Sequence, residues 1–260
     1  MSTPAKRGRP PRHPIDVLRT KIWFASLKKI SKLPSGYAIE MAICPVRQAG
    51  KSDGNPRPRK FAAYAKGQRI PQRKGGKPGS VDLAEVRFPG SAAAFDSAIW
   101  HLLTCESVDR EWIYSALRNL SWVSAALVGR QGVLRHPRQF HEGLAGLLSD
   151  LPACMETLAA ALLFWRLAET IADAELRQQA IDSYLMLQPD LEALPELAGD
   201  LARELFQAID TNFPHWVYSG ARRDEIVVLT NELRTFRAGQ ALTRRDINLR
   251  IAELREGRAH

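Results

Sequence analysis

The chain lacks the features of secreted and membrane-spanning proteins. Its 260 residues include only three cysteines, at wide spacings that favour neither a disulfide framework nor a zinc site. The longest strongly apolar stretch, residues 157–168, is interrupted by Arg166 and is shorter than the roughly 20 residues that a helix needs to cross a bilayer. The basic N-terminus has no apolar core of a signal peptide. We therefore expect a cytoplasmic protein whose three cysteines are reduced and structural: Cys44, Cys105 and Cys154.

Most enzyme signatures are absent as well. The sequence contains no Walker A motif, no dinucleotide-binding glycine pattern, no paired metal-ligand histidines and no Gly-x-Ser-x-Gly elbow. Aromatic residues make up 8% of the chain, and those in its first 90 residues fall mostly at helix-core positions, so nothing indicates a stacking platform for single-stranded nucleic acid. We expect no catalytic residue, no metal and no cofactor.

The net charge of +9 conceals an uneven distribution. Residues 1–90 carry 20 lysines and arginines against 5 acids, whereas residues 91–260 carry 17 against 23. Positive charge concentrated in one segment is typical of binding to nucleic acid phosphates. The alternatives are an acidic membrane surface, an acidic protein, or a solvated face without a partner. We expect duplex DNA as the partner, and charge alone leaves structured RNA open.

The basic segment begins with an arm over residues 1–13, which is too rich in proline and charge to form a core. Its residues 6–12, Lys-Arg-Gly-Arg-Pro-Pro-Arg, resemble an AT-hook. In that family an Arg-Gly-Arg-Pro core enters the minor groove of A·T-rich DNA. The resemblance implies that Arg7 and Arg9 are inserted into the groove, where a narrow A·T tract attracts arginine. The alternative is an arm that touches phosphates without base preference.

An amphipathic helix is predicted over residues 14–33, with proline in its first turn. Three lysines at helical spacing, Lys21, Lys28 and Lys32, stack on one side of it. This stripe is either a solvated face or a phosphate-binding face. The apolar arc on the other side consists of Ile15, Leu18, Ile22, Trp23, Leu27 and Ile30.

Shorter helices are expected after it, separated by two loops rich in glycine and proline. The first loop spans residues 44–58, and the second spans residues 68–79 and is basic. Phe61 and Tyr64 form the apolar pair of a helix that ends at Gly67. The predicted helices cover residues 36–43, 59–66, 80–87 and about 91–104.

This order of parts resembles the λ-repressor-like (Xre-type) helix-turn-helix family. The best local match is residues 61–71, FAAYAKGQRIP. In that family, a helix followed by a Gly-x-x-x-Pro stop is a common sequel to the second, base-reading helix of the motif. The resemblance implies that helix 36–43 has the supporting role in the motif and that helix 59–66 lies in or near the major groove. The chain departs from the family where some fifteen residues replace the usual tight turn between these helices.

The acidic half has apolar residues at helical spacing and no strand-like alternation, which completes an all-α fold with two helical domains. We predict that residues 157–168 form the centre of its bundle, with Trp165 in the core. A homodimer is expected because symmetric dimers are common and suit duplex sites. The acidic half is the candidate surface for a protein partner or an effector. Its predicted helices cover residues 109–120, 136–148, 153–172, 175–187, 191–209, 224–236 and 244–255.

Two other functions are open at this stage. Arg135 and His141 resemble the Arg-x(4 to 6)-His motif of the helical HEPN ribonucleases, in which arginine and histidine act together on an RNA phosphate. A basic loop and helix start explains the same residues without catalysis. The other function is that of a non-catalytic adaptor in a mobile-element or phage-defence assembly.

The favoured interpretation is a nucleoid-associated DNA-binding protein that regulates transcription. We expect three segments: the arm over 1–13, a basic helical DNA-binding domain over 14–104, and an acidic all-α domain over 105–260. Phosphate contacts by lysine and arginine supply affinity, and the arm adds A·T preference. The expected DNA-binding residues are Arg7, Arg9, Arg12, Lys21, Lys28, Lys32, Arg59, Lys60, Lys66, Arg69, Arg73 and Lys74.

Overall fold

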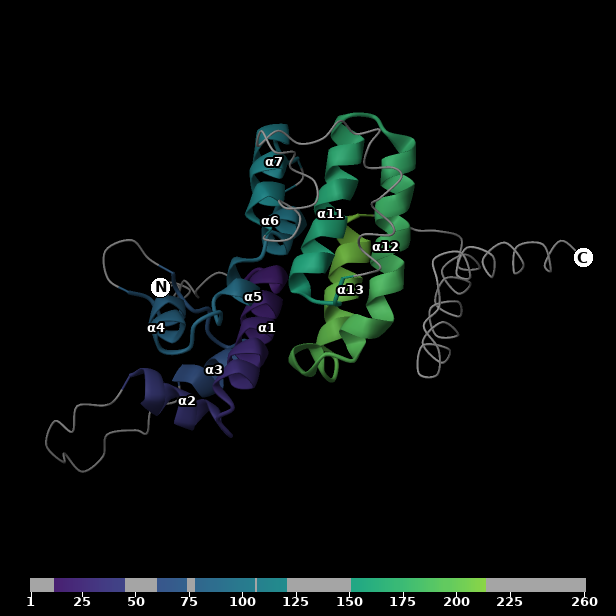
Figure 1. Cartoon of the computed structure of the whole chain (residues 1–260). Coiled ribbons are helices and arrows are strands. Elements are labelled where there is room, and N and C mark those ends of the chain that lie inside the picture. Colours follow the sequence, from purple (N-terminus) through teal and green to yellow (C-terminus); the bar gives the residue numbers. More distant parts are fainter. Residues whose placement is uncertain (1–11, 45–59, 74–77, 106, 121–150, 214–260) are drawn as a thin grey trace, which may run out of the picture. The chain divides into compact units, whose positions relative to one another are not determined.

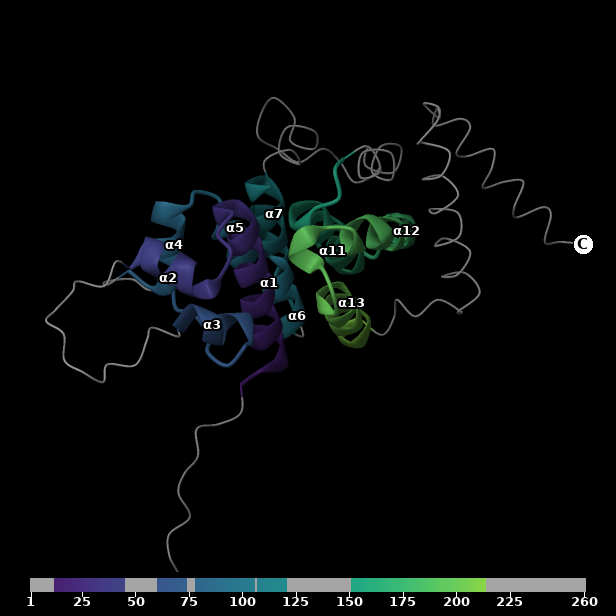
Figure 2. The same cartoon turned by 90° about the horizontal axis from the view of Figure 1, so that it is seen from below.

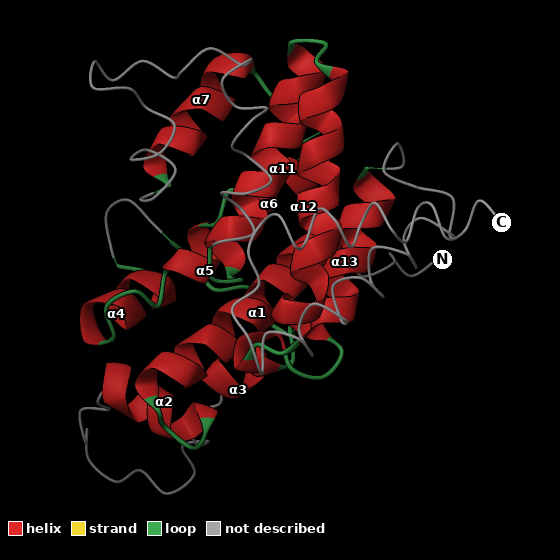
Figure 3. Cartoon of the chain, turned by 45° about the vertical axis from the view of Figure 1, so that its right-hand side comes forward, coloured by secondary structure: helices red, strands yellow, loops and turns green. Residues whose placement is uncertain are grey.

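The computed structural model describes residues 12–44, 60–73, 78–105, 107–120 and 151–213. Within these ranges the secondary structure consists of helices and contains no strand (Figures 1 and 3), which confirms the all-α prediction. The chain divides into two compact units, residues Met1–Asp96 and Ser97–His260. The expected division after residue 104 therefore lies eight residues too far along the chain.

The described residues of the N-terminal unit form five helices. The first of them, α1, begins where His13 accepts a hydrogen bond from the Ile15 amide through Nδ1, at 3.3 Å, and Pro14 occupies its first position. It ends at Lys32, whose φ of 56° is left-handed. The five helices of this unit are α1 (Pro14–Ser31), α2 (Gly36–Ile43), α3 (Lys60–Ala65), α4 (Ser80–Arg87) and α5 (Ala93–Asp96).

Trp23 of α1 lies at the centre of this unit. Its ring contacts those of Phe61, Tyr64 and Phe95 at centroid distances of 6.2, 5.6 and 5.9 Å, so α1 packs on α3 and α5. The Tyr64 hydroxyl reaches the Ser80 hydroxyl at 2.9 Å and joins α3 to α4. Ser80 is the first residue of α4, and Gly79 is the N-cap of this helix.

The helices α2 and α3 approach each other closely (Figure 2), although residues 44–59 separate them in sequence. A side chain at Gly36 would place its Cβ 3.1 Å from the Ala62 nitrogen, so only glycine allows this approach without a shift of the neighbouring backbone. The buried Glu40 carboxylate accepts a hydrogen bond from the Phe61 amide at 3.1 Å. A side chain of α2 thereby caps the N-terminal end of α3.

The C-terminal unit is built around α11 (Met155–Thr170), which packs on α6 (Ile99–Thr104), α7 (Arg110–Asn119) and α12 (Ala174–Glu192). Residues 157–165 of α11 are all buried, which confirms that this stretch is central and that Trp165 lies in the core. Within the predicted stretch 157–168, Arg166 is only partly buried. Its guanidinium carbon lies 4.5 Å from the centre of the Trp165 ring and 4.2 Å from the centre of the Phe213 ring. No helix in the described ranges is long and apolar enough to span a membrane.

Two predicted helices are each divided in the structure. The helix expected over 191–209 is interrupted by a 3₁₀ turn, Pro195–Leu197, and by Gly199 at a φ of 72°, before α13 (Leu201–Asn212) begins. Proline starts a new element there because it cannot donate the hydrogen bond that a continuing helix needs. The helix expected over 91–104 consists of α5 and α6, which lie in different units. The helices expected over 136–148, 224–236 and 244–255 lie outside the described residues.

We predict that Glu40→Ala loosens α3. The Phe61 amide would lose its buried acceptor, which costs about 1–3 kcal/mol, and a six-residue helix has little stability of its own. Hydrogen exchange measured by mass spectrometry should show faster exchange over residues 60–66. Glu192→Ala, at an exposed position of α12, is the matched control and should leave these amides unchanged. Unaltered exchange in the Glu40 variant would contradict the capping role.

Candidate nucleic-acid interface

The turn that ends α3 is pressed against α1. Gly67 has a φ of 64°, and the amides of Gly67 and Gln68 donate to the carbonyls of Tyr64 and Ala63 at 2.9 and 2.8 Å. This is a Schellman ending, which favours glycine at the left-handed position. A Cβ at Gly67 would come within 2.5 Å of the Val17 side chain, so the close approach to α1 also requires glycine.

Four cationic residues gather at this turn, and we call them the Gly67 cluster. The Arg12 guanidinium donates to the Gly67 carbonyl at 3.5 Å. The Lys21 chain passes beside Gly67, with Cε 3.6 Å from the position that a Cβ would take. Lys66 and Arg69 flank the turn in sequence and are exposed. Residues from three separate stretches of chain thus place positive charge around one turn.

A second basic feature starts from the same lysine. Lys21 and Lys28 are seven residues apart and share one face of α1 over roughly 10 Å, and Lys32 is the left-handed residue at which α1 ends. Lys28 and Lys32 are exposed, and Lys21 is partly buried. Two of the three lysines of the predicted stripe therefore share one face of α1, and one of them, Lys21, also belongs to the Gly67 cluster.

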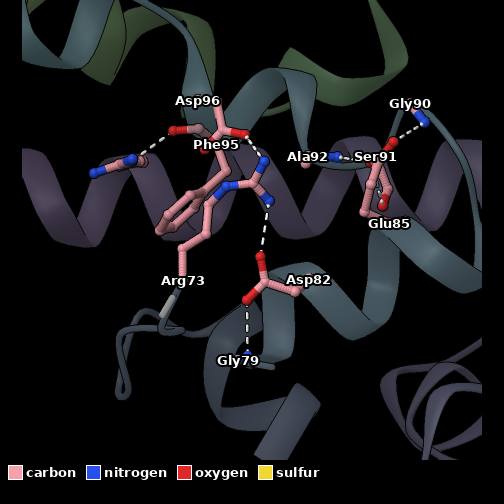
Figure 4. A network of polar contacts seen from close by, with 10 residues as sticks. Arg73, Gly79, Asp82, Glu85, Gly90, Ser91, Ala92, Phe95 and Asp96 are labelled. Atoms are coloured by element: carbon pink, nitrogen blue, oxygen red, sulfur yellow. Dashed lines mark hydrogen bonds and ion pairs between the residues drawn. The ribbon is translucent and has the colours of Figure 1, made fainter. Parts of the chain in front are cut away.

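Arg73 stands apart from these cations because two carboxylates neutralise it. Its guanidinium lies between Asp82 of α4 and Asp96 of α5, at 3.2 and 2.7 Å (Figure 4). Asp82 also accepts a hydrogen bond from the Gly79 amide at 2.7 Å. Arg73 therefore fastens the basic loop to α4 and α5, and its charge is used within the unit.

Arg19 is also used internally. Its Nε donates to the Phe95 carbonyl at 2.7 Å, and its guanidinium lies 3.8 Å from the centre of the Phe95 ring. Burial lowers the pKa of Arg19, although the charges of Asp96 and Asp16 oppose that change. Burial likewise raises the pKa of Asp96, against the influence of Arg73 and Arg19.

Glu85 holds the turn that links α4 to α5. Its carboxylate accepts hydrogen bonds from the Gly90 and Ala92 amides at 2.8 and 2.6 Å and from the Ser91 hydroxyl at 3.4 Å (Figure 4). Desolvation alone would raise the pKa of Glu85, but these hydrogen bonds and the Arg73 charge together lower it. Sequence reasoning gave Glu85 no role in this turn.

The structure describes eight of the twelve expected DNA-binding residues. Seven of these carry charge on α1, on α3 or at the Gly67 turn, and the eighth is the neutralised Arg73. Lys60 is partly buried at the start of α3. The expected residues outside the described ranges are Arg7, Arg9, Arg59 and Lys74, and the ribonuclease-like pair Arg135 and His141 also lies outside them.

Comparison with known proteins returns no match among family models, curated proteins or solved structures. The described residues contain no group of three or more histidine, cysteine, aspartate or glutamate side chains that could hold a metal ion. All three cysteines are free thiols and partly buried.

We predict that Glu85→Gln makes the chain less stable at neutral pH but not in acid. The pKa of Glu85 is lowered in the folded state, so its stabilisation is fully present above the ordinary value of 4.5 and is lost as the pH falls through the folded-state pKa. Because the group is only partly buried, solvent screens its charge and we expect a loss of about 1 kcal/mol or less at pH 7. Urea unfolding at pH 7 and pH 3 measures this difference. An equal loss at both pH values would show that the charge of Glu85 contributes nothing.

Proposed function

We propose that the N-terminal unit binds duplex DNA and that the protein acts as a transcriptional regulator. The observation that carries the proposal is the Gly67 cluster, in which residues from positions 12 to 69 place four cations around one turn. Two other arginines of the unit, Arg19 and Arg73, are held by internal partners. The unit therefore uses some of its positive charge for its own stability, while several other described cations are exposed: Arg12, Lys28, Lys32, Lys66 and Arg69.

The dimensions of the lysine stripe suit duplex DNA. B-form DNA carries a phosphate charge about every 1.7 Å of its axis, so Lys21 and Lys28, roughly 10 Å apart along α1, span several phosphates. Lysine binds phosphate as a mobile point charge and does not need the fixed geometry of a bidentate contact. Every lysine of the chain lies between residues 6 and 77, which supports an interface confined to this unit.

The AT-hook-like arm joins the unit beside the Gly67 cluster. Arg12, the last residue of the motif, reaches the Gly67 carbonyl, and the His13 cap with Pro14 sets the direction in which the chain enters α1. In this proposal Arg7 and Arg9 enter the minor groove next to the phosphates that the cluster binds. Homodimerisation, a nucleoid location and a partner surface on the acidic half belong to the same proposal.

We predict that removing residues 1–11 weakens binding to A·T-rich duplex more than to G·C-rich duplex, by about tenfold if two inserted arginines are lost. This truncation keeps Arg12 and His13, so the start of α1 remains intact. Fluorescence anisotropy with the two duplexes and a structured RNA, each at two salt concentrations, measures the effect. Equal losses on both duplexes would show an arm that touches phosphates alone.

The same titration distinguishes the other functions. Weak binding of the full chain to both duplexes, or a clear preference for RNA, would contradict the DNA-binding proposal. The His141→Ala variant would then test the ribonuclease alternative through loss of RNA cleavage. A stoichiometric protein partner without any DNA site would favour the adaptor.

We predict that Lys28→Ala with Lys32→Ala reduces the salt dependence of DNA binding. Each phosphate contact contributes about 0.9 to the slope of log affinity against log salt, so the slope should fall by up to about 1.8. Arg118→Ala with Arg203→Ala removes the same charge from exposed positions on α7 and α13 and is the matched control. A salt dependence equal to that of the unaltered chain would show that Lys28 and Lys32 do not contact DNA phosphates.

A further inference from the structure

The two ends of α3 differ in what they present to a ligand. Its N-terminal end is occupied by a carboxylate, its exposed side consists largely of alanine, and its C-terminal end carries the Gly67 cluster. We propose that α3 contacts duplex DNA through backbone phosphates at the Gly67 turn and does not read the bases. This inference rests on the proposed DNA-binding function and assigns the part of the DNA that this surface binds.

The N-terminal end of α3 is closed by Glu40. In helix-turn-helix proteins the N-terminal residues of the recognition helix contact base edges in the major groove. Here the Glu40 carboxylate, 7% exposed, takes the hydrogen bond of the Phe61 amide at 3.1 Å. That amide is unavailable to a ligand, and a carboxylate at this end repels phosphates. Among the described residues, Lys60 adds a cation at this end and is partly buried, whereas the preceding Arg59 lies outside the described ranges.

Apart from the partly buried Lys60, the described side chains along α3 cannot distinguish base pairs by hydrogen bonding. Phe61 and Tyr64 are buried, and the Tyr64 hydroxyl is already bonded to Ser80. Ala62 and Ala65 are exposed and offer only methyl groups, whose specific contact in the major groove is the thymine methyl. Discrimination among the four base pairs uses bidentate groups such as arginine, asparagine or glutamine, and the described exposed face of α3 has none.

The C-terminal end of α3 carries more positive charge than helix stability requires. One cation near a helix C-terminus contributes about 0.3–1 kcal/mol through the helix dipole, and a helix of six residues has a short one. The Gly67 cluster supplies four cations, of which Arg12 already donates to the Gly67 carbonyl at 3.5 Å. Lys66 and Arg69 are exposed, and both can contact phosphates without a fixed orientation.

The test compares base preference with affinity in the full-length chain. Lys66→Ala with Arg69→Ala should lower affinity by about ten- to a hundredfold, and by the same factor for A·T-rich, G·C-rich and mixed duplexes. Its salt slope should fall by up to about 1.8. Arg118→Ala with Arg203→Ala controls for the change in net charge. Lys66→Arg with Arg69→Lys keeps the charge and should restore affinity.

Selection from a pool of randomised duplexes measures base preference directly. The unaltered chain, the Lys66/Arg69 variant and Lys60→Ala should enrich the same sequences, because none of these side chains reads a base in this proposal. Far-ultraviolet circular dichroism and urea unfolding confirm that each variant is folded.

The outcomes separate this inference from the function on which it rests. A changed set of enriched sequences in either variant would overturn the inference and identify α3 as a reading helix. An unchanged salt slope in the Lys66/Arg69 variant would also overturn it, while DNA binding by the full chain would stand. Absence of salt-dependent DNA binding by the unaltered chain would instead refute the proposed function itself.

Discussion

Burial of Trp23 is the constraint on which the N-terminal unit depends. The indole lies among the rings of Phe61, Tyr64 and Phe95, which come from α3 and from α5. Burying about 200 Å² of aromatic surface contributes roughly 5 kcal/mol. The Trp23 Nε1 has no hydrogen-bond partner among the described residues, which costs about 1–3 kcal/mol. The apolar contribution exceeds this cost, and the packing holds together helices that are too short to be stable alone.

The candidate interface is a consequence of this packing. Because α1 and α3 share the Trp23 core, the end of α3 lies against α1, and the glycine at that end allows contact with Val17 and Lys21. Lysines on α1 and on the α3 turn then occupy one surface. The same packing closes the other end of α3, where Gly36 and Glu40 of α2 meet it. Charge and shape together make this helix a poor reader of bases and a suitable support for phosphates.

Sequence reasoning located most elements of the basic unit but not the roles of its charges. The helix over residues 36–43 was predicted with its observed bounds, because Ser35 and the apolar pattern are local signals. Ile30 was placed in the core, yet it is 38% exposed, because it lies in the last turn of α1. Arg73 was assigned to DNA, but Asp82 and Asp96 bind it. These carboxylates are 9 and 23 residues away in the sequence, so no local sequence pattern around Arg73 predicts that they bind it.

The sequence by itself determined the all-α class, the helix ends marked by proline, serine and glycine, and the concentration of positive charge in the first 90 residues. These properties depend on backbone geometry and composition, which act over a few residues or over the whole chain. Tertiary structure alone decided that Arg12 and Lys21 join Lys66 and Arg69 at one turn and that Arg19 and Arg73 are held by other partners. Partners distant in sequence are selected by packing, and the helical period of one segment carries no information about which other segment it will touch.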